Sequence, residues 1–439
     1  MRIALVTPHA TQPGCDRTDE AGPQVGPLAQ ALAQFGHEVT VYARADSPGL
    51  PTTLRLAPGV TVEHVHVGPR KRLATDDLGP HVAAFGSHLR ARWQHGAPDI
   101  VHAYAWPGGL AAVTGAQDLG VPVAMTFHSL SDGGPRRVSS TREPVAWLRL
   151  KASLARAVDG VLARSSAEMT RLVGMGVPRS AIQVVPWGVD TGHFTPQAPA
   201  AGLDRRAGRR AAGEVRPWAA GDAQPCLLAG WPHSPRHGLE VVVQAMADLP
   251  GVRLVVAGGP QRSRLRHSVV YRGANALAAK VGVADRLAFT GAVDRAGLRA
   301  VLRSADLMVT GAWDELFDEM ALQAMACGTP VVAPASGFYA DAVIDGTTGL
   351  LVPPGRPGVL ARRIRQALDS PMRIEAFGIA AADRASARFS WERIGRETVR
   401  AYQRLLPVAV AVSGHPGEDD DDLDGAEAAH PVGVPALAG

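Results

Sequence analysis

The sequence predicts an α/β protein with two Rossmann-like, doubly wound domains, and three observations support this fold class. The 439 residues exceed one ordinary core, since a domain usually holds about 150 residues. Short apolar runs of strand length alternate with stretches of helical apolar spacing, which is typical of parallel sheets covered by helices on both faces. This alternation stops between Gln197 and Gln224, where Pro, Gly, Ala and Arg dominate, and then restarts. We therefore expect two domains that face a central cleft.

The first half of the chain begins with a strand at Ile3–Val6, a helix at Val25–Phe35 and a strand at Val39–Tyr42, which form one strand, helix, strand unit. Five further strands are expected at Val60–Glu63, Ile100–Ala103, Val121–Phe127, Gly160–Arg164 and Gln183–Pro186. Four further helices are expected at Val82–Trp93, Gly108–Asp118, Val145–Val158 and Ser166–Met175.

The second half repeats the alternation. Its expected strands are Cys226–Ala229, Val252–Val256, Leu287–Thr290, Leu307–Val309 and Val331–Ala333. Its expected helices cover Leu239–Asp248, Ala274–Val281, Leu298–Ser304, a helix that begins near Asp318, and a last stretch that ends near Leu406.

These elements predict the domain limits. Residues 1–196 form the first Rossmann-like domain, 197–224 a linker and 225–386 the second Rossmann-like domain. Residues 387–406 form a helix that packs back on the first domain, and 411–439 a disordered acidic tail.

Composition excludes several classes of protein. The chain is 46% hydrophobic and 20% charged, as globular chains are, and its net charge of +4 is too small to argue for nucleic-acid binding. Cys15, Cys226 and Cys327 are odd in number and widely spaced, which fits neither a disulfide framework nor a metal cluster. No apolar run approaches the roughly 18 residues of a membrane-spanning helix. We expect a cytoplasmic protein with at most peripheral membrane contact, and the oligomeric state stays open.

The segment from Trp313 to Val332 carries the most information about function. A loop with Glu315 leads into a helix of apolar spacing, and Gly328-Thr-Pro330 ends that helix before a buried strand. A helix whose amino terminus faces a crevice can receive a diphosphate. The segment therefore predicts part of a phosphate-bearing substrate site.

Several motifs, each weak alone, occur in a specific order together with this segment. They are Gly36-His-Glu-Val39, Asp99-Ile-Val-His-Ala103, Thr126-Phe-His128, Val185-Pro-Trp-Gly-Val-Asp190, Val255-Val-Ala-Gly-Gly-Pro260, Arg303-Ser-Ala-Asp306, Asp345-Gly-Thr-Thr-Gly-Leu-Leu-Val-Pro353 and Arg388-Phe-Ser-Trp391. In this order they resemble the retaining family 4 glycosyltransferases of the GT-B fold. The similar branch is the bacterial one that includes sucrose-phosphate synthase and the inositol-phosphate glycosyltransferase of mycothiol synthesis. The resemblance covers residues 1 to about 405.

The resemblance implies transfer of a hexose from a nucleoside-diphosphate sugar to a hydroxyl group of a small-molecule or lipid-linked acceptor. It implies retention of the anomeric configuration, no metal and no further cofactor. Without a metal, basic side chains and helix amino termini must hold the leaving diphosphate.

On the donor side, Glu315 matches the first, catalytic position of the family's Glu-x7-Glu pair, and Gln323 matches the second, where an amide can still bind ribose. Phe317 and Asp318 lie between them, and Asp318 stands where the family usually has Gly. Asp318 either meets the donor or caps its own helix, and Gln323 is alternatively a polar helix residue.

In the predicted phosphate loop Gly230–Gly238, the resemblance implies that Arg236 and His237 contact the donor phosphates. His237 stands in place of a lysine and Trp231 in place of an arginine, so a permanently charged pair is not reproduced.

On the acceptor side, the resemblance makes His128 a catalytic residue at the carboxyl end of a strand, and a core histidine is the alternative. It places Asp19, Glu20 and Gly22 in a loop where relatives carry two glycines. His102 is expected to be structural.

The altered donor contacts leave a second hypothesis open, that of a catalytically weak or inactive relative that serves as a binding or regulatory protein. A nicotinamide-dependent oxidoreductase would need Gly-x-Gly-x-x-Gly after a first strand, and neither Thr7-Pro-His-Ala10 nor Ala229-Gly-Trp-Pro232 supplies it.

Overall fold

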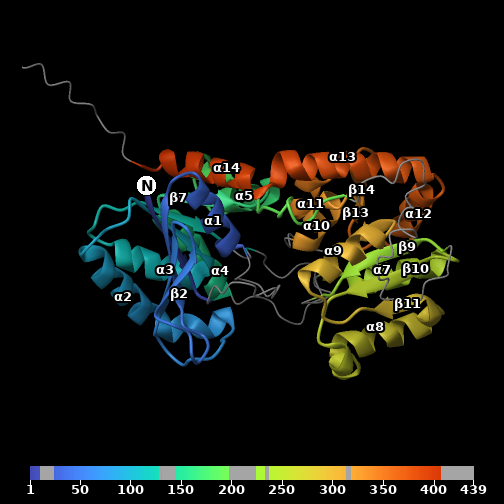
Figure 1. Cartoon of the computed structure of the whole chain (residues 1–439), viewed down its shortest axis with the longest axis horizontal. Coiled ribbons are helices and arrows are strands. Elements are labelled where there is room, and N and C mark those ends of the chain that lie inside the picture. Colours follow the sequence, from blue (N-terminus) through green and yellow to red (C-terminus); the bar gives the residue numbers. More distant parts are fainter. Residues whose placement is uncertain are drawn as a thin grey trace, which may run out of the picture. The chain divides into compact units, whose positions relative to one another are not determined.

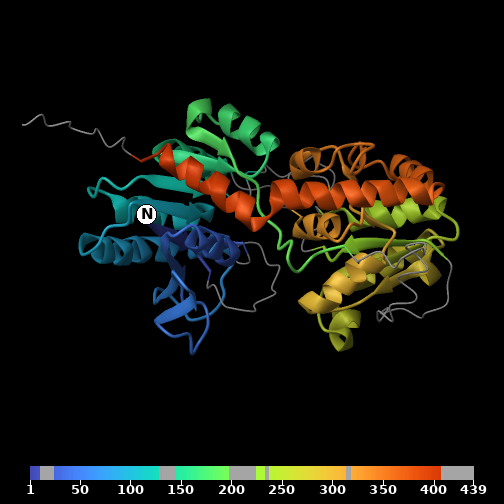
Figure 2. The same cartoon turned by 45° about the horizontal axis from the view of Figure 1, so that its top comes forward.

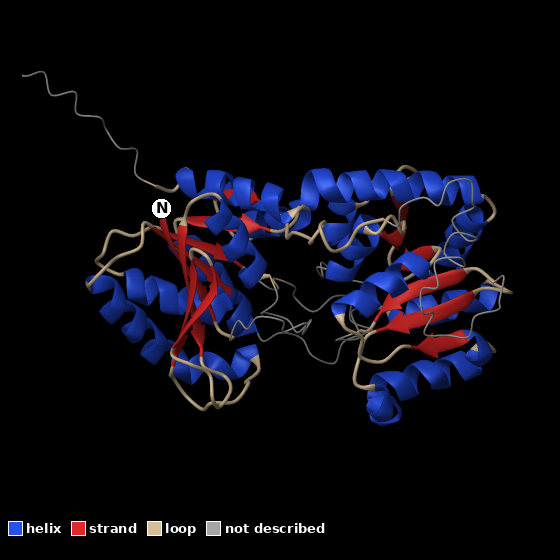
Figure 3. Cartoon of the chain, viewed as in Figure 1, coloured by secondary structure: helices blue, strands red, loops and turns tan. Residues whose placement is uncertain are grey.

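The computed structural model describes residues 1–9, 24–127, 130, 145–196, 224–232, 237–312 and 318–406. Within these ranges the strands form two sheets with helices on both faces (Figure 1, Figure 3). The doubly wound α/β class predicted from the sequence is therefore confirmed.

The first sheet has the strand order β3-β4-β2-β1-β5-β6-β7-β8. Its strands are β1 (Arg2–Thr7), β2 (Glu38–Arg44), β3 (Thr53–Ala57), β4 (Val60–Val65), β5 (Ile100–Tyr104), β6 (Val123–Thr126), β7 (Gly160–Ala163) and β8 (Ile182–Val184). Its helices are α1 (Val25–Gln34), α2 (Val82–Gln94), α3 (Ala105–Ala116), α4 (Val145–Ala157) and α5 (Ser166–Gly174), with the 3₁₀ turns η1 (Thr75–His81) and η2 (Arg179–Ala181).

One strand of this sheet corrects the expectation of a purely parallel sheet. β3, which the sequence analysis missed, runs antiparallel to β4 at the sheet edge. Only Pro58 and Gly59 separate the two strands, and Gly59 has φ 75°, which a tight hairpin turn requires. A two-residue connection permits only antiparallel pairing.

The second sheet is entirely parallel among the described residues, with the order β11-β10-β9-β12-β13-β14. Its strands are β9 (Cys226–Gly230), β10 (Arg253–Ala257), β11 (Leu287–Phe289), β12 (Leu307–Val309), β13 (Val331–Pro334) and β14 (Gly349–Val352). Its helices are α7 (Leu239–Ala245), α8 (Val269–Lys280), α9 (Arg295–Ser304), α10 (Glu319–Ala326), α11 (Gly337–Ala342), α12 (Pro357–Leu368) and α13 (Pro371–Phe389), with the 3₁₀ turns η4 (Met246–Asp248), η5 (Arg262–His267) and η6 (Ala284–Arg286).

Each sheet separates two apolar layers. In the second sheet, α9, α10, α11 and α13 contribute to one buried cluster, and α7, α8 and α12 to the other. In the first sheet, α2, α3 and α4 cover one face, while α1 shares the other face with the last described helix, α14 (Trp391–Gln403). α13 and α14 are consecutive helices that meet at Ser390, whose hydroxyl caps α14 (Figure 2).

A buried polar network joins α14 to the first sheet. His102 Nδ1 lies 2.8 Å from Tyr402 Oη and His102 Nε2 lies 2.9 Å from Thr126 Oγ1. Burial lowers the pKa of His102 to about 3, so the ring is neutral at physiological pH. The structural role expected for His102 is confirmed, whereas the predicted domain limits stay predictions.

Candidate functional site

The carboxyl edge of the second sheet contains a topological switch point. From β9 the chain proceeds to β10 on one side, while β12 pairs with β9 on the other. In open α/β sheets, ligands bind outside the carboxyl ends of the strands at such a point. The residues that follow β9 and β12 therefore mark the candidate site.

Two glycines bring the loops after these strands into contact. Gly238 has φ 66°, and a Cβ added there would lie 1.9 Å from the carbonyl oxygen of Gly311. A Cβ on Gly311 would in turn lie 2.3 Å from the carbonyl oxygen of Gly238. Any side chain at either position would collide with the facing backbone, so only glycine fits. Because Gly238 is the N-cap residue of α7, this backbone contact fixes the position at which α7 begins.

Trp231 follows β9 and packs as an apolar side chain. Its backbone N–H donates to the Ala257 carbonyl at 2.8 Å, and its indole meets Phe289 edge-on with ring centroids 6.1 Å apart. A Cβ on Gly259, which has φ 97°, would lie 2.5 Å from the indole ring. Where the resemblance expects a cationic side chain, this chain has an aromatic ring that packs on a glycine.

Asp318 is the N-cap residue of α10. Its Oδ1 accepts from the backbone N–H of Ala321 at 3.3 Å, and its Oδ2 accepts from the Tyr339 hydroxyl at 3.0 Å. Tyr339 is fully buried, and burial together with the Asp318 charge raises the pKa of its phenol well above the ordinary value. Asp318 therefore caps its own helix, which is one of the two roles expected for it. Its contact with a donor stays a prediction.

Glu319 and Gln323 face each other one turn apart on α10. Gln323 is buried, and its Nε2 donates to Glu319 Oε1 at 2.9 Å. Burial raises the pKa of the Glu319 carboxyl, while a hydrogen bond from Gln24, the charge of Arg295 and the hydrogen bond from Gln323 oppose this shift. The nearby Asp318 charge raises the pKa further.

Two family descriptions match the chain, namely Glycosyltransferase Family 4 over residues 24–193 and Glycosyl transferases group 1 over residues 233–384. The D-inositol 3-phosphate glycosyltransferase 2 of Catenulispora acidiphila is 33% identical over 423 residues, which cover 92% of this chain and 95% of that protein. The D-inositol 3-phosphate glycosyltransferase of Actinosynnema mirum is 34% identical over 424 residues, or 93% of this chain and 98% of that one. The chain belongs to glycosyltransferase family 4.

Solved structures agree with this assignment. Sucrose-phosphate synthase from Thermosynechococcus elongatus matches 92% of this family 4 chain with a TM-score of 0.77 and 26% identity, over 98% of its own length. Anabaena HepE in complex with UDP-glucose has a TM-score of 0.66 at 19% identity, over 92% of this chain and 100% of that one, which shows the fold alone. The GT-B fold predicted from the sequence is confirmed.

Most of the predicted site residues of this family 4 chain lie outside the described residues, and their roles stay predictions. These are Asp19, Glu20, Gly22, His128, Arg236, Glu315 and Phe317. Of the remaining three, His237 is partly buried and directly precedes Gly238, while Asp318 and Gln323 lie on the first turns of α10. The structure thus brings these three predicted residues to the carboxyl edge of one sheet.

The carboxyl edge of the first sheet also carries unusual features. Ala105, which follows β5, has φ 55°, a strained conformation for a residue with a Cβ. Thr7 Oγ1, at the end of β1, and Gln24 Oε1, just before α1, are buried without a hydrogen-bond partner in the described part of the chain. Buried polar atoms of this kind are rare, and a bound ligand or water can satisfy them.

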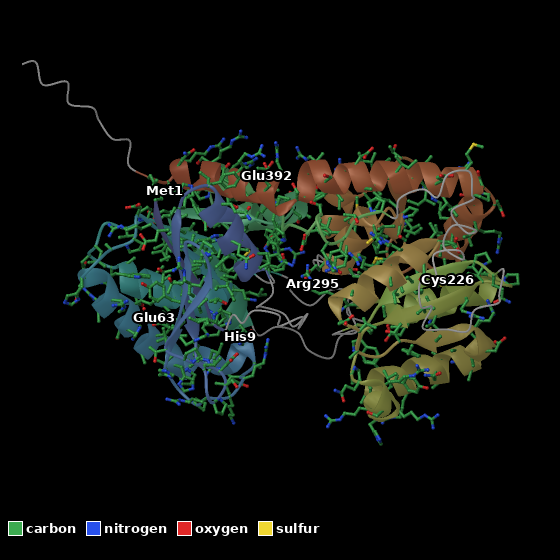
Figure 4. All side chains as sticks on the ribbon, in the orientation of Figure 1. Met1, His9, Glu63, Cys226, Arg295 and Glu392 are labelled. Atoms are coloured by element: carbon green, nitrogen blue, oxygen red, sulfur yellow. The ribbon has the colours of Figure 1, made fainter. Side chains whose placement is uncertain are left out.

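Arg295 is a residue that the sequence analysis missed. It starts α9, whose N-cap Asp294 accepts from the Gly297 N–H at 2.7 Å, and Figure 4 labels it. Its guanidinium donates to Asp190 Oδ2 at 2.8 Å and lies 5.5 Å from the Phe194 ring centroid. The motif Val185–Asp190 was noted as a family feature, but only the fold brings Arg295 to it.

Within the described ranges, no group of three His, Cys, Asp or Glu side chains is placed to hold a metal ion. In that same part of the chain, no helix has both the length and the apolar character needed to cross a membrane.

Proposed function

We propose that this family 4 chain transfers a hexose from a nucleoside-diphosphate sugar to a hydroxyl group of its acceptor, with retention of the anomeric configuration. The observation that carries the proposal is the similarity over nearly the whole chain to D-inositol 3-phosphate glycosyltransferases. The similarity to sucrose-phosphate synthase supports it. Both names point to acceptors or products that carry a phosphate, so phosphorylated polyols and sugars are the first acceptors to test.

The proposed donor site lies at the switch point of the second sheet. Gly258 and Gly259 follow β10 at this edge, and the Trp231 ring packs on Gly259. Asp318 and Glu319 place negative charge at the start of α10, so the diphosphate requires a cation to offset them. The charge of Arg295 already acts on Glu319, which supports a role for this residue in offsetting the negative charge.

The test is calorimetric and thermal-shift titration with UDP, GDP, ADP and their sugars. A ligand that binds only the folded protein must stabilise it, by about 2.7 kcal/mol at a hundredfold excess over Kd. No response to any of them at millimolar concentration would overturn the proposal. Release of nucleoside diphosphate in the presence of inositol phosphates or sugar phosphates then identifies the acceptor, and an inverted anomeric centre in the product would refute retention.

One observation favours the alternative of a weak or inactive relative that binds without turnover. Trp231 packs its ring on Gly259 and supplies no charge for a leaving diphosphate. Nucleotide binding with no release of diphosphate for any acceptor would support this alternative over catalysis.

A further inference from the structure

The stretch of chain around β10 and α8 is positively charged throughout. No Asp or Glu occurs from Leu249 to Ala284, whereas the same stretch contains five arginines and one lysine. The whole chain is nearly balanced, with 45 basic residues against 41 acidic ones. A local excess of one sign on a nearly neutral protein attracts partners of the opposite charge.

Three of these arginines occupy alternate positions on the 3₁₀ turn η5. Arg262, Arg264 and Arg266 are exposed, while Leu265 is buried and anchors the turn. In the described part of the chain, none of their guanidinium groups takes part in an ion pair or a hydrogen bond. Three guanidinium groups are therefore available to an anionic ligand outside the protein.

Helix α8 extends this surface with an outer face that lacks acidic residues. Ala274 and Ala278 are buried on its inner face. The outer face of a surface helix normally carries charged and polar side chains of both signs. Here the exposed residues fall within about a third of the helix circumference, and they are Val269, Arg272, Gly273, Ala276, Ala279 and Lys280. The outer face thus combines apolar or small residues with two cations.

Val269 favours a lipid surface over other anionic partners. It is 75% exposed at the start of α8, three residues after the last arginine of η5. A nucleic-acid backbone offers phosphates but no apolar layer that would cover this side chain. The boundary between headgroups and acyl chains of a bilayer offers both.

The position of α8 in the second domain suits contact with a flat surface. The helix lies at an outer end of this domain, beyond the edge strand β11 (Figure 1). Nitrogen-bearing side chains project from this end, away from the sheet (Figure 4).

We propose that the η5–α8 surface, formed by Arg262, Arg264, Arg266, Val269 and Arg272, binds a lipid bilayer that contains anionic lipids. The arginines pair with headgroup phosphates, and Val269 enters the apolar boundary beneath them. Because this attraction decays within a Debye length, binding is reversible and weakens as salt is added. The inference goes beyond the proposed function and does not depend on the transferase reaction.

Vesicle flotation of the full-length protein tests the proposal. The probes are vesicles of phosphatidylcholine alone and vesicles of phosphatidylcholine mixed with phosphatidylglycerol. We expect binding to the mixed vesicles at low salt, with affinity at least about tenfold above that for phosphatidylcholine alone. Raising the salt concentration reduces this difference.

A triple variant measures the part played by the arginines. Arg262→Gln/Arg264→Gln/Arg266→Gln lowers the affinity for mixed vesicles about fiftyfold or more, since one arginine near an anionic surface contributes about fivefold. A matched control removes the same charge from exposed positions on α12, α13 and α14, and its affinity stays within about twofold of wild type. This control is Arg362→Gln/Arg388→Gln/Arg400→Gln.

A second pair of variants measures the apolar contact. Val269→Asn lowers the affinity for mixed vesicles about threefold or more, because the polar side chain no longer enters the acyl boundary. Met372→Asn is the control, since Met372 is 82% exposed on α13, and it leaves the affinity unchanged. All substituted residues are exposed, so the free energy of unfolding stays at the wild-type value in every variant.

Each outcome decides the proposal. Losses in the η5 variant and in Val269→Asn that the two controls do not share support it. Equal losses in both triple variants overturn it, because net charge alone would then account for binding. An unchanged affinity in Val269→Asn also overturns it, and equally tight binding of a DNA duplex would then identify a general site for polyanions. Absence of binding to the mixed vesicles at low salt overturns it outright.

Discussion

Among single residues, Asp318 at the start of α10 stabilises the folded protein but adds negative charge where a donor diphosphate would bind. Asp318 satisfies the Ala321 N–H and the buried Tyr339 hydroxyl, which makes it a useful cap. The same carboxylate adds negative charge at a helix amino terminus that would otherwise attract phosphate. Asp318 therefore favours folding and opposes the proposed ligand.

The first prediction separates these two effects. Asp318→Gly removes the helix cap and leaves the Tyr339 hydroxyl with only the Thr310 hydroxyl, 3.4 Å away, as a partner. The free energy of unfolding therefore falls by about 1–2 kcal/mol in urea titrations. The loss of charge raises the affinity for UDP roughly two- to fivefold. Asp318→Asn keeps the cap and shows the same gain in affinity with little loss of stability. An unchanged affinity in both variants would mean that the diphosphate does not approach this helix end.

The second prediction concerns the dependence of stability on pH. Burial raises the pKa of Glu319 in the folded protein, so the folded state binds its proton more tightly than the unfolded state does. This carboxyl group therefore favours folding below its ordinary pKa, and the contribution is lost as the pH rises through the raised pKa. In chemical denaturation at a series of pH values, Glu319→Gln removes this decline and is more stable than wild type at neutral pH. A variant with the same pH profile as wild type would contradict the burial of this charge.

At the scale of elements, helix α14 is joined to the first sheet by polar as well as apolar contacts. His102 on β5 lies between Tyr402 on α14 and Thr126 on β6, and all three are buried. Ile394 and Ala401 pack in the same cluster as Ile3 and Leu5. Helix α14 thus covers part of one face of the first sheet.

This network gives the third prediction. The pKa of His102 is about 3 in the folded protein, whereas in the unfolded chain it keeps its ordinary value near 6.5. As the pH falls below 6.5 the unfolded state gains a proton that the folded state excludes, so stability declines by up to about 1.4 kcal/mol per pH unit until the pH reaches about 3. His102→Asn loses this part of the decline between pH 7 and pH 5 in urea titrations. The control His95→Asn, at an exposed position after α2, keeps it.

In the whole molecule, two segments of the chain connect the first sheet to the second, and they contact each other at Val189 and Ser390. The backbone N–H of Val189 donates to the Phe389 carbonyl at 2.7 Å, and Val189 and Ser390 form a parallel bridge. Gly188 is buried, and a Cβ there would lie 2.6 Å from the Trp391 ring. Gly188 and Trp391, about 200 residues apart in the sequence, therefore pack directly against each other.

The fourth prediction tests this contact. Gly188→Ala forces the methyl group against Trp391 and lowers the free energy of unfolding by about 1–3 kcal/mol. In a double-mutant cycle, Trp391→Leu opens space, so Gly188→Ala costs less in that background. Additive effects of the two substitutions would show that the ring does not limit the glycine.

Buried strands could be predicted from the sequence, whereas most side-chain contacts could not. β1, β5 and β12 were readable because buried parallel strands are continuous apolar runs. β3 was missed because Thr53–Ala57 is a short strand at a sheet edge and has no continuous apolar run. β14, α11, α12 and α13 were missed as well. At the site, Asp318 and Gln323 were found by their position in a motif. Arg295 and Gln24 were not found, because their roles depend on neighbours that are distant in the sequence.

Apolar periodicity and motif order are properties of the linear chain, and they were enough to predict two doubly wound domains and a glycosyltransferase family. The roles of the altered residues depend on contacts that form only when the chain folds. Trp231 packs on Gly259, Asp318 binds Tyr339, and Gln323 donates to Glu319. These contacts join side chains whose directions are set by packing and by hydrogen-bond geometry, neither of which is recorded in the spacing of residues along the sequence.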